Sequence, residues 1–103
     1  MIEIKNAKIT STFLGREDHG IPTCFVHLDY GSSAQGFGGY DLRFPSYGID
    51  FITKILSTLE VASWEKLPGT YCRAKADRCC VQAIGHITKD QWFSPTPDNE
   101  DTV

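Results

Sequence analysis

Hydrophobic and polar residues alternate along the first part of the chain. Over residues 2–14 (IEIKNAKITSTFL), isoleucine and phenylalanine side chains recur among lysines and threonines with a period of two, which predicts a β-strand with one buried face. The period slips near Asn6-Ala7, where we expect a bulge. The next segment, residues 15–20, is polar and bounded by glycines, so it predicts a hairpin loop.

Residues 21–30 (IPTCFVHLDY) form the predicted return strand of that hairpin. One face of this strand is apolar and carries Cys24, Val26 and Leu28. The opposite face is partly polar, and we expect it to meet solvent. It carries Thr23, Phe25, His27 and Asp29.

The glycine-rich segment 34–44 (AQGFGGYDLRF) predicts a third strand. Aliphatic residues over 52–59 then follow an i, i+3, i+4, i+7 spacing, which is typical of an amphipathic helix packed on a sheet. Ser46 is the expected N-cap of this helix. A further helical turn is predicted within residues 61–67, with Ser63 as its N-cap.

Two more strands are predicted over residues 70–76 and 79–87, joined by a turn at Asp77-Arg78. We expect Trp92-Phe93 to cap the core or to add an edge. The order βββαββ predicts an α+β fold, with an antiparallel sheet of about five strands and one amphipathic helix packed on it.

Composition sets the domain boundaries and excludes some functions. With 103 residues, 41 % of them hydrophobic, the chain can bury one core, so we expect a single α+β domain over residues 1–94. Residues 95–103 hold two prolines and three of the 13 acidic residues without a basic one, which predicts an acidic, disordered tail. The net charge of −3 therefore belongs to the tail, and a neutral domain argues against a dedicated duplex-DNA binder.

The location of the protein also follows from the sequence pattern. The charged, alternating N-terminus is unlike a secretory signal, and no apolar run approaches the length that spans a bilayer. We therefore expect a cytoplasmic protein without a membrane partner. In that compartment disulfides are the least favoured role for the four cysteines.

The glycine segment is the first candidate site. Its sequence QGFGGY matches neither of the phosphate-binding glycine motifs, so we interpret the glycines as letting a strand bend or letting a neighbouring aromatic ring lie on the backbone. The alternative is a binding surface in which Phe37 and Tyr40 offer stacking rings. A second candidate is the basic and aromatic patch of Tyr71, Arg73 and Lys75, which can hold a single strand or a phosphate but is also typical of an exposed edge hairpin.

Acidic and imidazole groups form a third candidate, because they could bind a metal ion or transfer protons, although a solvated hairpin tip often carries them too. This cluster comprises Glu17, Asp18, His19, His27 and Asp29. A zinc site would draw on Cys72, Cys79, Cys80 and His86. No C-x₂-C pair is present, however, and we expect His86 to lie about 20 Å along the strand from a Cys72–Cys80 pair. We assign no catalytic residue, metal ion or cofactor from the sequence.

Several segments resemble a family of small proteins encoded by bacteriophages and prophages. The shared segments are Glu17-Asp18-His19-Gly20, Leu28-Asp29-Tyr30-Gly31, Gln35-Gly36-Phe37-Gly38-Gly39-Tyr40, and Trp64 followed by Leu67-Pro68-Gly69. The resemblance covers about residues 5–93 and implies a phage context, hence the cytoplasm of a bacterial host cell, without catalytic residues to carry over. Members with a longer insertion between the glycine segment and the helix differ from this chain, which has only Arg43-Phe44-Pro45-Ser46 there.

We expect first a non-enzymatic inhibitor of the anti-CRISPR type, which blocks a host defence protein or complex by protein–protein contact. The second hypothesis is a protein that binds a nucleotide or a single-stranded nucleic acid, and the third a metal-dependent hydrolase built on the acidic cluster. A homodimer could form through the edge hairpin. The candidate binding residues are Phe25, Gln35, Phe37, Tyr40, Tyr47, Trp64, Tyr71, Arg73 and Lys75.

Overall fold

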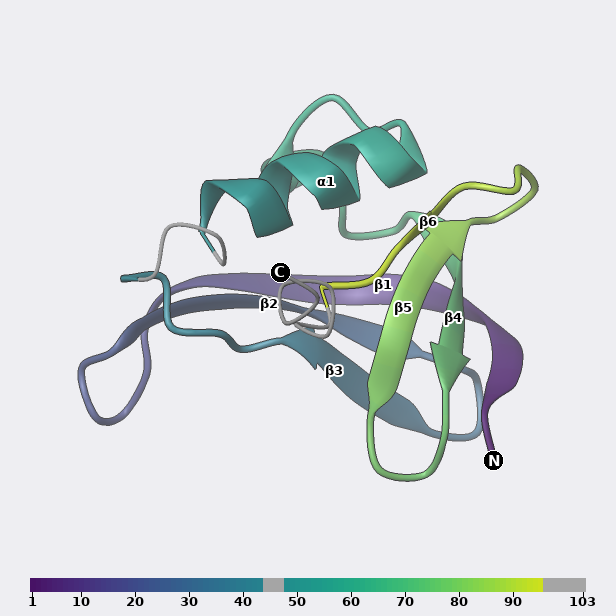
Figure 1. Cartoon of the computed structure of the whole chain (residues 1–103), viewed down its shortest axis with the longest axis horizontal. Coiled ribbons are helices and arrows are strands. Elements are labelled where there is room, and N and C mark those ends of the chain that lie inside the picture. Colours follow the sequence, from purple (N-terminus) through teal and green to yellow (C-terminus); the bar gives the residue numbers. More distant parts are fainter. Residues whose placement is uncertain (44–47, 96–103) are drawn as a thin grey trace, which may run out of the picture.

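The computed structural model describes residues 1–43 and 48–95, which form an antiparallel sheet with a helix packed against it (Figure 1). The elements are β1 (Glu3–Arg16), β2 (Pro22–Asp29), β3 (Ala34–Gly38), α1 (Ile49–Leu59), the 3₁₀ turn η2 (Trp64–Lys66), β4 (Tyr71–Ala76), β5 (Val81–His86) and β6 (Trp92–Phe93). The strands lie in the order β3-β2-β1-β4-β5-β6. The predicted α+β fold is confirmed, and within the described residues the sheet has six strands because Trp92-Phe93 adds an edge beside β5.

The long strand β1 joins the two parts of the sheet. Up to Lys8 it pairs with β4, and from Lys8 onward it pairs with β2. The register shifts between Ile9 and Ser11, which makes Thr10 the extra residue of a β-bulge. The strand bends there, and Figure 1 shows the β4–β5 hairpin running across the direction of β1, β2 and β3.

The bulge lies further along the chain than the predicted Asn6-Ala7. The difference arises because Ile4, which the alternation placed with the buried set, points to solvent with 58 % of its surface exposed. The buried residues of this part of β1 are Ala7 and Ile9.

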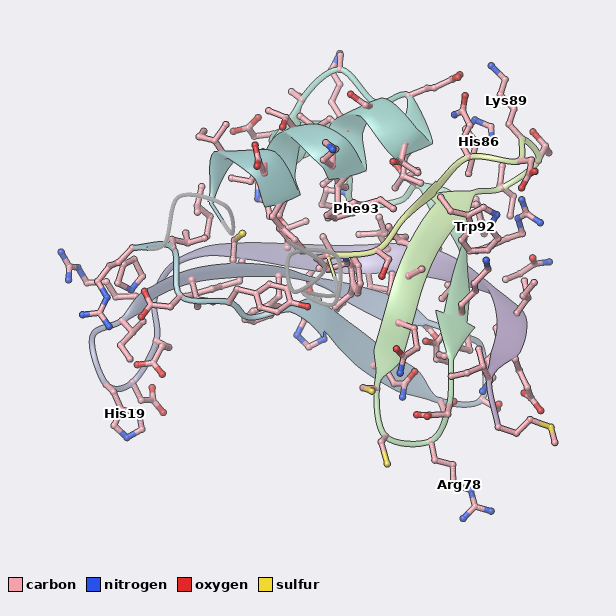
Figure 2. The ribbon with its side chains drawn as sticks, viewed as in Figure 1. His19, Arg78, His86, Lys89, Trp92 and Phe93 are labelled. Carbon is pink, nitrogen blue, oxygen red and sulfur yellow. The ribbon has the colours of Figure 1, made fainter. Side chains whose placement is uncertain are left out.

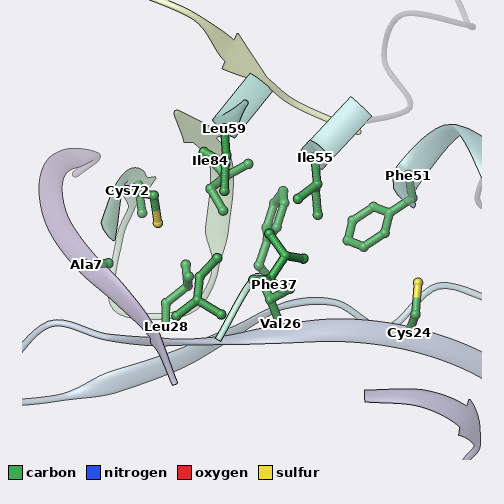
Figure 3. Packing of buried hydrophobic residues seen from close by; sticks show 13 residues of the cluster. Ala7, Cys24, Val26, Leu28, Phe37, Phe51, Ile55, Leu59, Cys72 and Ile84 are labelled. Atoms are coloured by element: carbon green, nitrogen blue, oxygen red, sulfur yellow. The ribbon is translucent and has the colours of Figure 1, made fainter. Parts of the chain in front are cut away.

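The helix α1 covers one face of the sheet, which we call the inner face (Figures 1 and 3). The inner-face core comprises Ala7, Ile9, Cys24, Val26, Leu28, Phe37, Cys72, Ala74 and Ile84. Phe51, Ile55 and Leu59 of α1 pack on it, with Ile52 and Leu56 only partly buried beside them. The helix was predicted correctly, but its N-cap is Gly48, without a side-chain hydrogen bond, and not the expected Ser46, which lies outside the described residues. No helix in the described part of the chain is both long and apolar enough to cross a membrane.

Gly38 marks the closest approach of α1 to the sheet. A Cβ atom at this position would lie 2.7 Å from the Phe51 ring and 2.7 Å from the backbone oxygen of Cys24, and its φ is +120°. This confirms the interpretation that a glycine of the segment lets an aromatic ring rest on the backbone. Because Gly38 and Gly39 both have positive φ, the strand ends at Gly38 and residues 39–43 do not continue it as expected, while Phe44, the last residue of the predicted strand, lies outside the described residues.

The sheet curls so that its two edge strands approach each other beneath α1. Phe37 of β3 and Phe93 of β6 meet edge to face, with ring centroids 6.3 Å apart. Gln35 adds a polar link between β3 and the β4–β5 turn, because its Nε2 donates to the carbonyl oxygens of Asp77 (2.9 Å) and Arg78 (3.3 Å).

Candidate functional site

The sheet face that points away from α1, which we call the outer face, carries aromatic side chains that are exposed or partly exposed, among them Phe25 and Tyr71. Its side chains fall into two groups separated by the bulge at Thr10. The aromatic half consists of Phe13, Phe25, His27 and Gly36 on β1, β2 and β3. The basic half consists of Lys8, Tyr71, Arg73, Lys75 and Trp92 on β1, β4 and β6.

In the aromatic half, two phenylalanine rings stack across the β1–β2 pair. The centroids of Phe13 and Phe25 are 5.2 Å apart with 18° between the ring planes. The imidazole of His27 meets the Phe25 ring edge-on at 5.1 Å. Because the Phe13 ring also rests over Gly15, where an added Cβ would lie 3.2 Å from it, this group is held in place without an inserted ligand.

Gly36 leaves the aromatic half open on its β3 side. It lies opposite His27, and a Cβ added to it would meet nothing within 4 Å. Its φ is not in the positive range that favours glycine. A glycine inside a strand costs about 0.5–1 kcal/mol relative to alanine, so this one reduces stability without any packing or backbone requirement for it.

In the basic half, the Trp92 ring lies flat on the backbone of Gly85. A Cβ at Gly85 would be 2.5 Å from a ring atom, so only glycine allows this arrangement. The Lys75 ammonium and the Arg73 guanidinium lie 4.4 Å and 4.8 Å from the Trp92 ring centroid, within cation–π range. Figure 2 shows Trp92 and Phe93 on opposite sides of the strand, with Phe93 beneath α1.

The loop between β5 and β6 fixes Arg73 in this position. Its Nε donates to the carbonyl oxygen of His86 (2.8 Å) and its Nη2 to that of Lys89 (2.9 Å). Lys89 is in turn paired through its Nζ with both carboxylate oxygens of Glu60 at the end of α1 (2.9 and 2.8 Å), and this contact holds the Glu60 pKa below its ordinary value. The guanidinium is therefore oriented before any ligand arrives.

The other part of the basic half is the exposed Tyr71 ring, which has 60 % of its surface accessible. Lys8 lies directly opposite it in the register, with Nζ 5.6 Å from the ring centroid. Next to the pair is a shallow hollow of about 320 Å³ whose lining includes Asn6, Lys8, Asp29, Tyr30 and Tyr71.

The sequence-based candidates divide into exposed and internal residues. Phe25, Tyr71, Arg73 and Lys75 lie on the outer face as expected for the first two hypotheses. Phe37 is wrong as an exposed ring, because only 2 % of its surface is accessible and it packs against Phe51 (5.6 Å).

The remaining candidates have structural contacts. Gln35 uses its amide nitrogen on the β4–β5 turn, and its Oε1 accepts from the hydroxyl of Tyr30 (2.6 Å). Tyr40 and Trp64 are half-buried against the core, Tyr40 with its ring 5.8 Å from that of Phe51. Tyr47 lies outside the described residues.

Sequence reasoning missed Lys8, Phe13 and Trp92 as members of the outer face. Phe13 was missed because the expected bulge at Asn6-Ala7 keeps it on the face of Ile9, whereas the observed bulge at Thr10 turns it to the face of Phe25. No local sequence pattern indicated Lys8 or Trp92. Lys8 reaches the outer face through the pairing of β1 with the distant β4, and Trp92 through the pairing of β6 with β5 across a loop.

The predicted acidic cluster does not form. His19 and Glu17 lie at the tip of the β1–β2 hairpin, where Glu17 accepts the backbone N–H groups of His19 and Ile21, and these contacts lower its pKa. Asp29 lies at the other end of β2 and accepts from the N–H of Gly31 (2.7 Å). Asp18 and His27 are exposed, and among residues 1–43 and 48–95 no three His, Cys, Asp or Glu side chains come together as metal ligands would.

The zinc alternative was based on a wrong register. Cys72 lies opposite His86 and not near Cys80. Cys79 and Cys80 are exposed in the β4–β5 turn, not at the start of a strand, because Asp77 accepts both of their N–H groups (2.8 and 3.0 Å). Burial raises the pKa of the Cys72 thiol to about 12, which disfavours the thiolate that a metal needs.

Comparison with known proteins gives no match: no family model, curated protein or solved structure corresponds to the chain.

Proposed function

We propose that the chain is a small, non-enzymatic binding protein of phage or prophage origin that inhibits a host defence protein or complex by covering part of its surface. The resemblance of the sequence to phage-encoded proteins supports the context. The aromatic half supports the mode of action, because exposed aromatic rings dominate the binding energy of protein interfaces.

The observation that carries the proposal is the combination of the stacked Phe13–Phe25 pair with the open space at Gly36. A strand glycine without a packing role is found where another backbone approaches closely. Here the partner's chain would lie against β3 and place an apolar side chain on the Phe25 ring. Lysine and arginine side chains lie on the other side of the bulge, so the contact would be chiefly apolar.

The test exploits the fact that the fold does not need glycine at position 36. The replacement Gly36→Val fills the open space with a residue that favours strands, so we expect unchanged or slightly higher stability together with loss of the partner. The wild-type chain, Gly36→Val, Phe25→Ala and the control Lys54→Gln on the exposed side of α1 would be expressed in bacteria that each carry one defence system.

The measurement is the efficiency with which a defence-sensitive phage forms plaques on these cells. We expect the wild-type chain and Lys54→Gln to restore plaques in one of the strains, while the two outer-face variants do not. Affinity purification from that strain should then recover a component of its defence system with the wild-type chain only. Equal plaque formation with folded Gly36→Val would refute the proposal. The homodimer stays a prediction, which size-exclusion chromatography of the same variants addresses.

A further inference from the structure

Three cations of the basic half lie on neighbouring positions of β1 and β4. Tyr71, Arg73 and Lys75 alternate with buried residues of β4 and therefore share the outer face, and Lys8 on β1 lies opposite Tyr71. In the part of the chain that the structure describes, none of the three cations Lys8, Arg73 and Lys75 makes an ion pair with a carboxylate. Two carboxylates border this surface: Asp29 lies opposite Lys8 in the register and accepts the backbone N–H of Gly31, and Asp90 accepts the indole N–H of Trp92 (3.2 Å).

Aromatic rings are interleaved with these cations. Trp92 lies between Gly85 and the charged ends of Arg73 and Lys75, and Tyr71 extends into solvent beside Lys8. Protein surfaces that hold single-stranded nucleic acid combine the same two elements, a positive track for the phosphates and flat rings on which unpaired bases stack. A protein partner for this surface would need acidic side chains placed opposite the three cations, whereas a single-stranded nucleic acid carries a negative charge at every phosphate.

The size and charge of the surface distinguish a single strand from a duplex. The domain as a whole is neutral, and three cations are too few for the broad basic footprint of a duplex-binding protein. The hollow of about 320 Å³ beside Tyr71 has room for one small group, as an unpaired base is, whereas the bases of a duplex are not accessible for stacking.

From these observations we infer that the basic half binds single-stranded nucleic acid weakly and without sequence preference. One base stacks on Tyr71, and the phosphates that follow contact Lys8, Arg73 and Lys75. Consecutive outward positions of β4 are about 7 Å apart, so the cations of Arg73 and Lys75 follow the strand at regular intervals. This activity goes beyond the proposed function, because it uses other residues and does not need the defence protein.

The test is fluorescence anisotropy of labelled ten-nucleotide thymidine (DNA) and uridine (RNA) oligomers with the full chain. Non-specific binding of this type has a Kd of about 1–100 µM at physiological salt. With three phosphate contacts we expect the logarithm of the binding constant to fall with the logarithm of salt concentration with a slope of about −2. The DNA and RNA arms report whether the 2′-hydroxyl matters.

Two variants and two controls test whether the oligonucleotide binds to the basic half. Tyr71→Ala removes the stacking ring from an exposed position and should weaken binding about five-fold or more. Lys75→Gln should lower the salt slope by about 0.7. The two controls are Lys54→Gln on α1 and Phe25→Ala in the aromatic half. Neither should change the affinity for the oligonucleotide or the salt slope.

Several results would overturn the inference. One is the absence of an anisotropy change with about 200 µM protein in about 50 mM salt, where electrostatic binding is strongest. The others are equal weakening by Phe25→Ala and Tyr71→Ala, and equal affinity for a duplex of the same length. Loss of restored plaque formation in Gly36→Val together with unchanged oligonucleotide binding would show that the two activities are separate, so either can fail without the other.

Discussion

The two halves of the outer face use glycine in opposite ways. In the basic half, Gly85 is covered by the Trp92 ring, and an added Cβ would lie 2.5 Å from that ring. In the aromatic half, Gly36 faces open space, although it too lies in the middle of a paired strand. Gly85 is required by the fold, because the Trp92 ring occupies the space of a side chain. Gly36 is not required by the fold, and the space above it can be occupied by a binding partner. For this reason we propose that the aromatic half binds a protein partner in the open space at Gly36. The basic half is already ordered by its own contacts and is proposed to bind single-stranded nucleic acid.

The largest change in stability that we expect from replacing one of these glycines is at Gly38, two residues from Gly36 on the same strand. Gly38→Ala would place a Cβ 2.7 Å from Phe51 and from the oxygen of Cys24 at a φ of +120°. We expect a loss of about 3 kcal/mol in the free energy of unfolding, because clash and backbone strain add. Urea unfolding monitored by circular dichroism measures it. Gly36→Ala is the matched control and should change stability by less than about 1 kcal/mol, in the stabilising direction. Equal destabilisation by both variants would remove the distinction between the two glycines.

The second prediction concerns the pH dependence of stability, which the buried thiols of Cys24 on β2 and Cys72 on β4 should influence. Burial raises their pKa values from 9.0 to about 11 and about 12. Above pH 9 the unfolded chain releases these protons while the native chain retains them, so the native state binds more protons and stability must fall as the pH rises. The window is pH 9–11 for Cys24 and pH 9–12 for Cys72.

Each thiol adds at most about 1.4 kcal/mol per pH unit to this loss. Unfolding free energies measured from pH 8 to pH 11 should therefore decrease, and Cys72→Ala and Cys24→Ala should each flatten the slope whatever their stability at pH 8. A slope that neither replacement changes would mean that other groups govern alkaline unfolding.

The third effect, at Gly85, is smaller because Trp92 is only partly buried and can move outward. Gly85→Ala should cost about 1–2 kcal/mol and expose the indole. The chain has two tryptophans, so the measurement uses a Trp64→Phe background in which Trp92 is the remaining fluorophore. We expect a red shift of its emission on Gly85→Ala. An unshifted spectrum would contradict the seating of the ring on Gly85.

Local patterns predicted the parts of this molecule that short-range physics determines. The alternation in residues 23–29 identified Cys24, Val26 and Leu28 as buried and Phe25 as outward, because the side-chain period of a strand is local. Thr23, which was expected to meet solvent, is instead buried and donates its hydroxyl to the carbonyl oxygen of Tyr40 (2.8 Å). The helix followed from its spacing, and the glycine segment was correctly interpreted as backbone that accommodates a ring. These features positioned the aromatic half except for Phe13.

The basic half could not be predicted in the same way. The contacts of Trp92 with Arg73 and Lys75 need three strands in the correct register, and register depends on pairing between residues far apart in sequence. Phe37 was misassigned for a related reason. The pairing of β3 with β2 puts Phe37 opposite the buried Val26, and its ring meets Phe93 on that inner face.

The smallest expected energies are the coupling energies of the side-chain contacts within each half. Double-mutant cycles on Phe13 and Phe25 should give a coupling energy of about 1 kcal/mol that is insensitive to salt, because the contact is between uncharged rings. Cycles on Lys75 and Trp92, with Lys75→Met to retain most of the aliphatic chain, should give about 0.5 kcal/mol, since the pair is partly exposed. Raising the salt to about 1 M should reduce this second coupling toward zero, because the Debye length falls to about 3 Å, below the ammonium-to-ring distance of 4.4 Å. If the Phe13–Phe25 coupling decreased with salt instead, the two halves would not differ in the kind of interaction that stabilises them, and the assignment of an apolar partner to one and an anionic partner to the other would lose its basis.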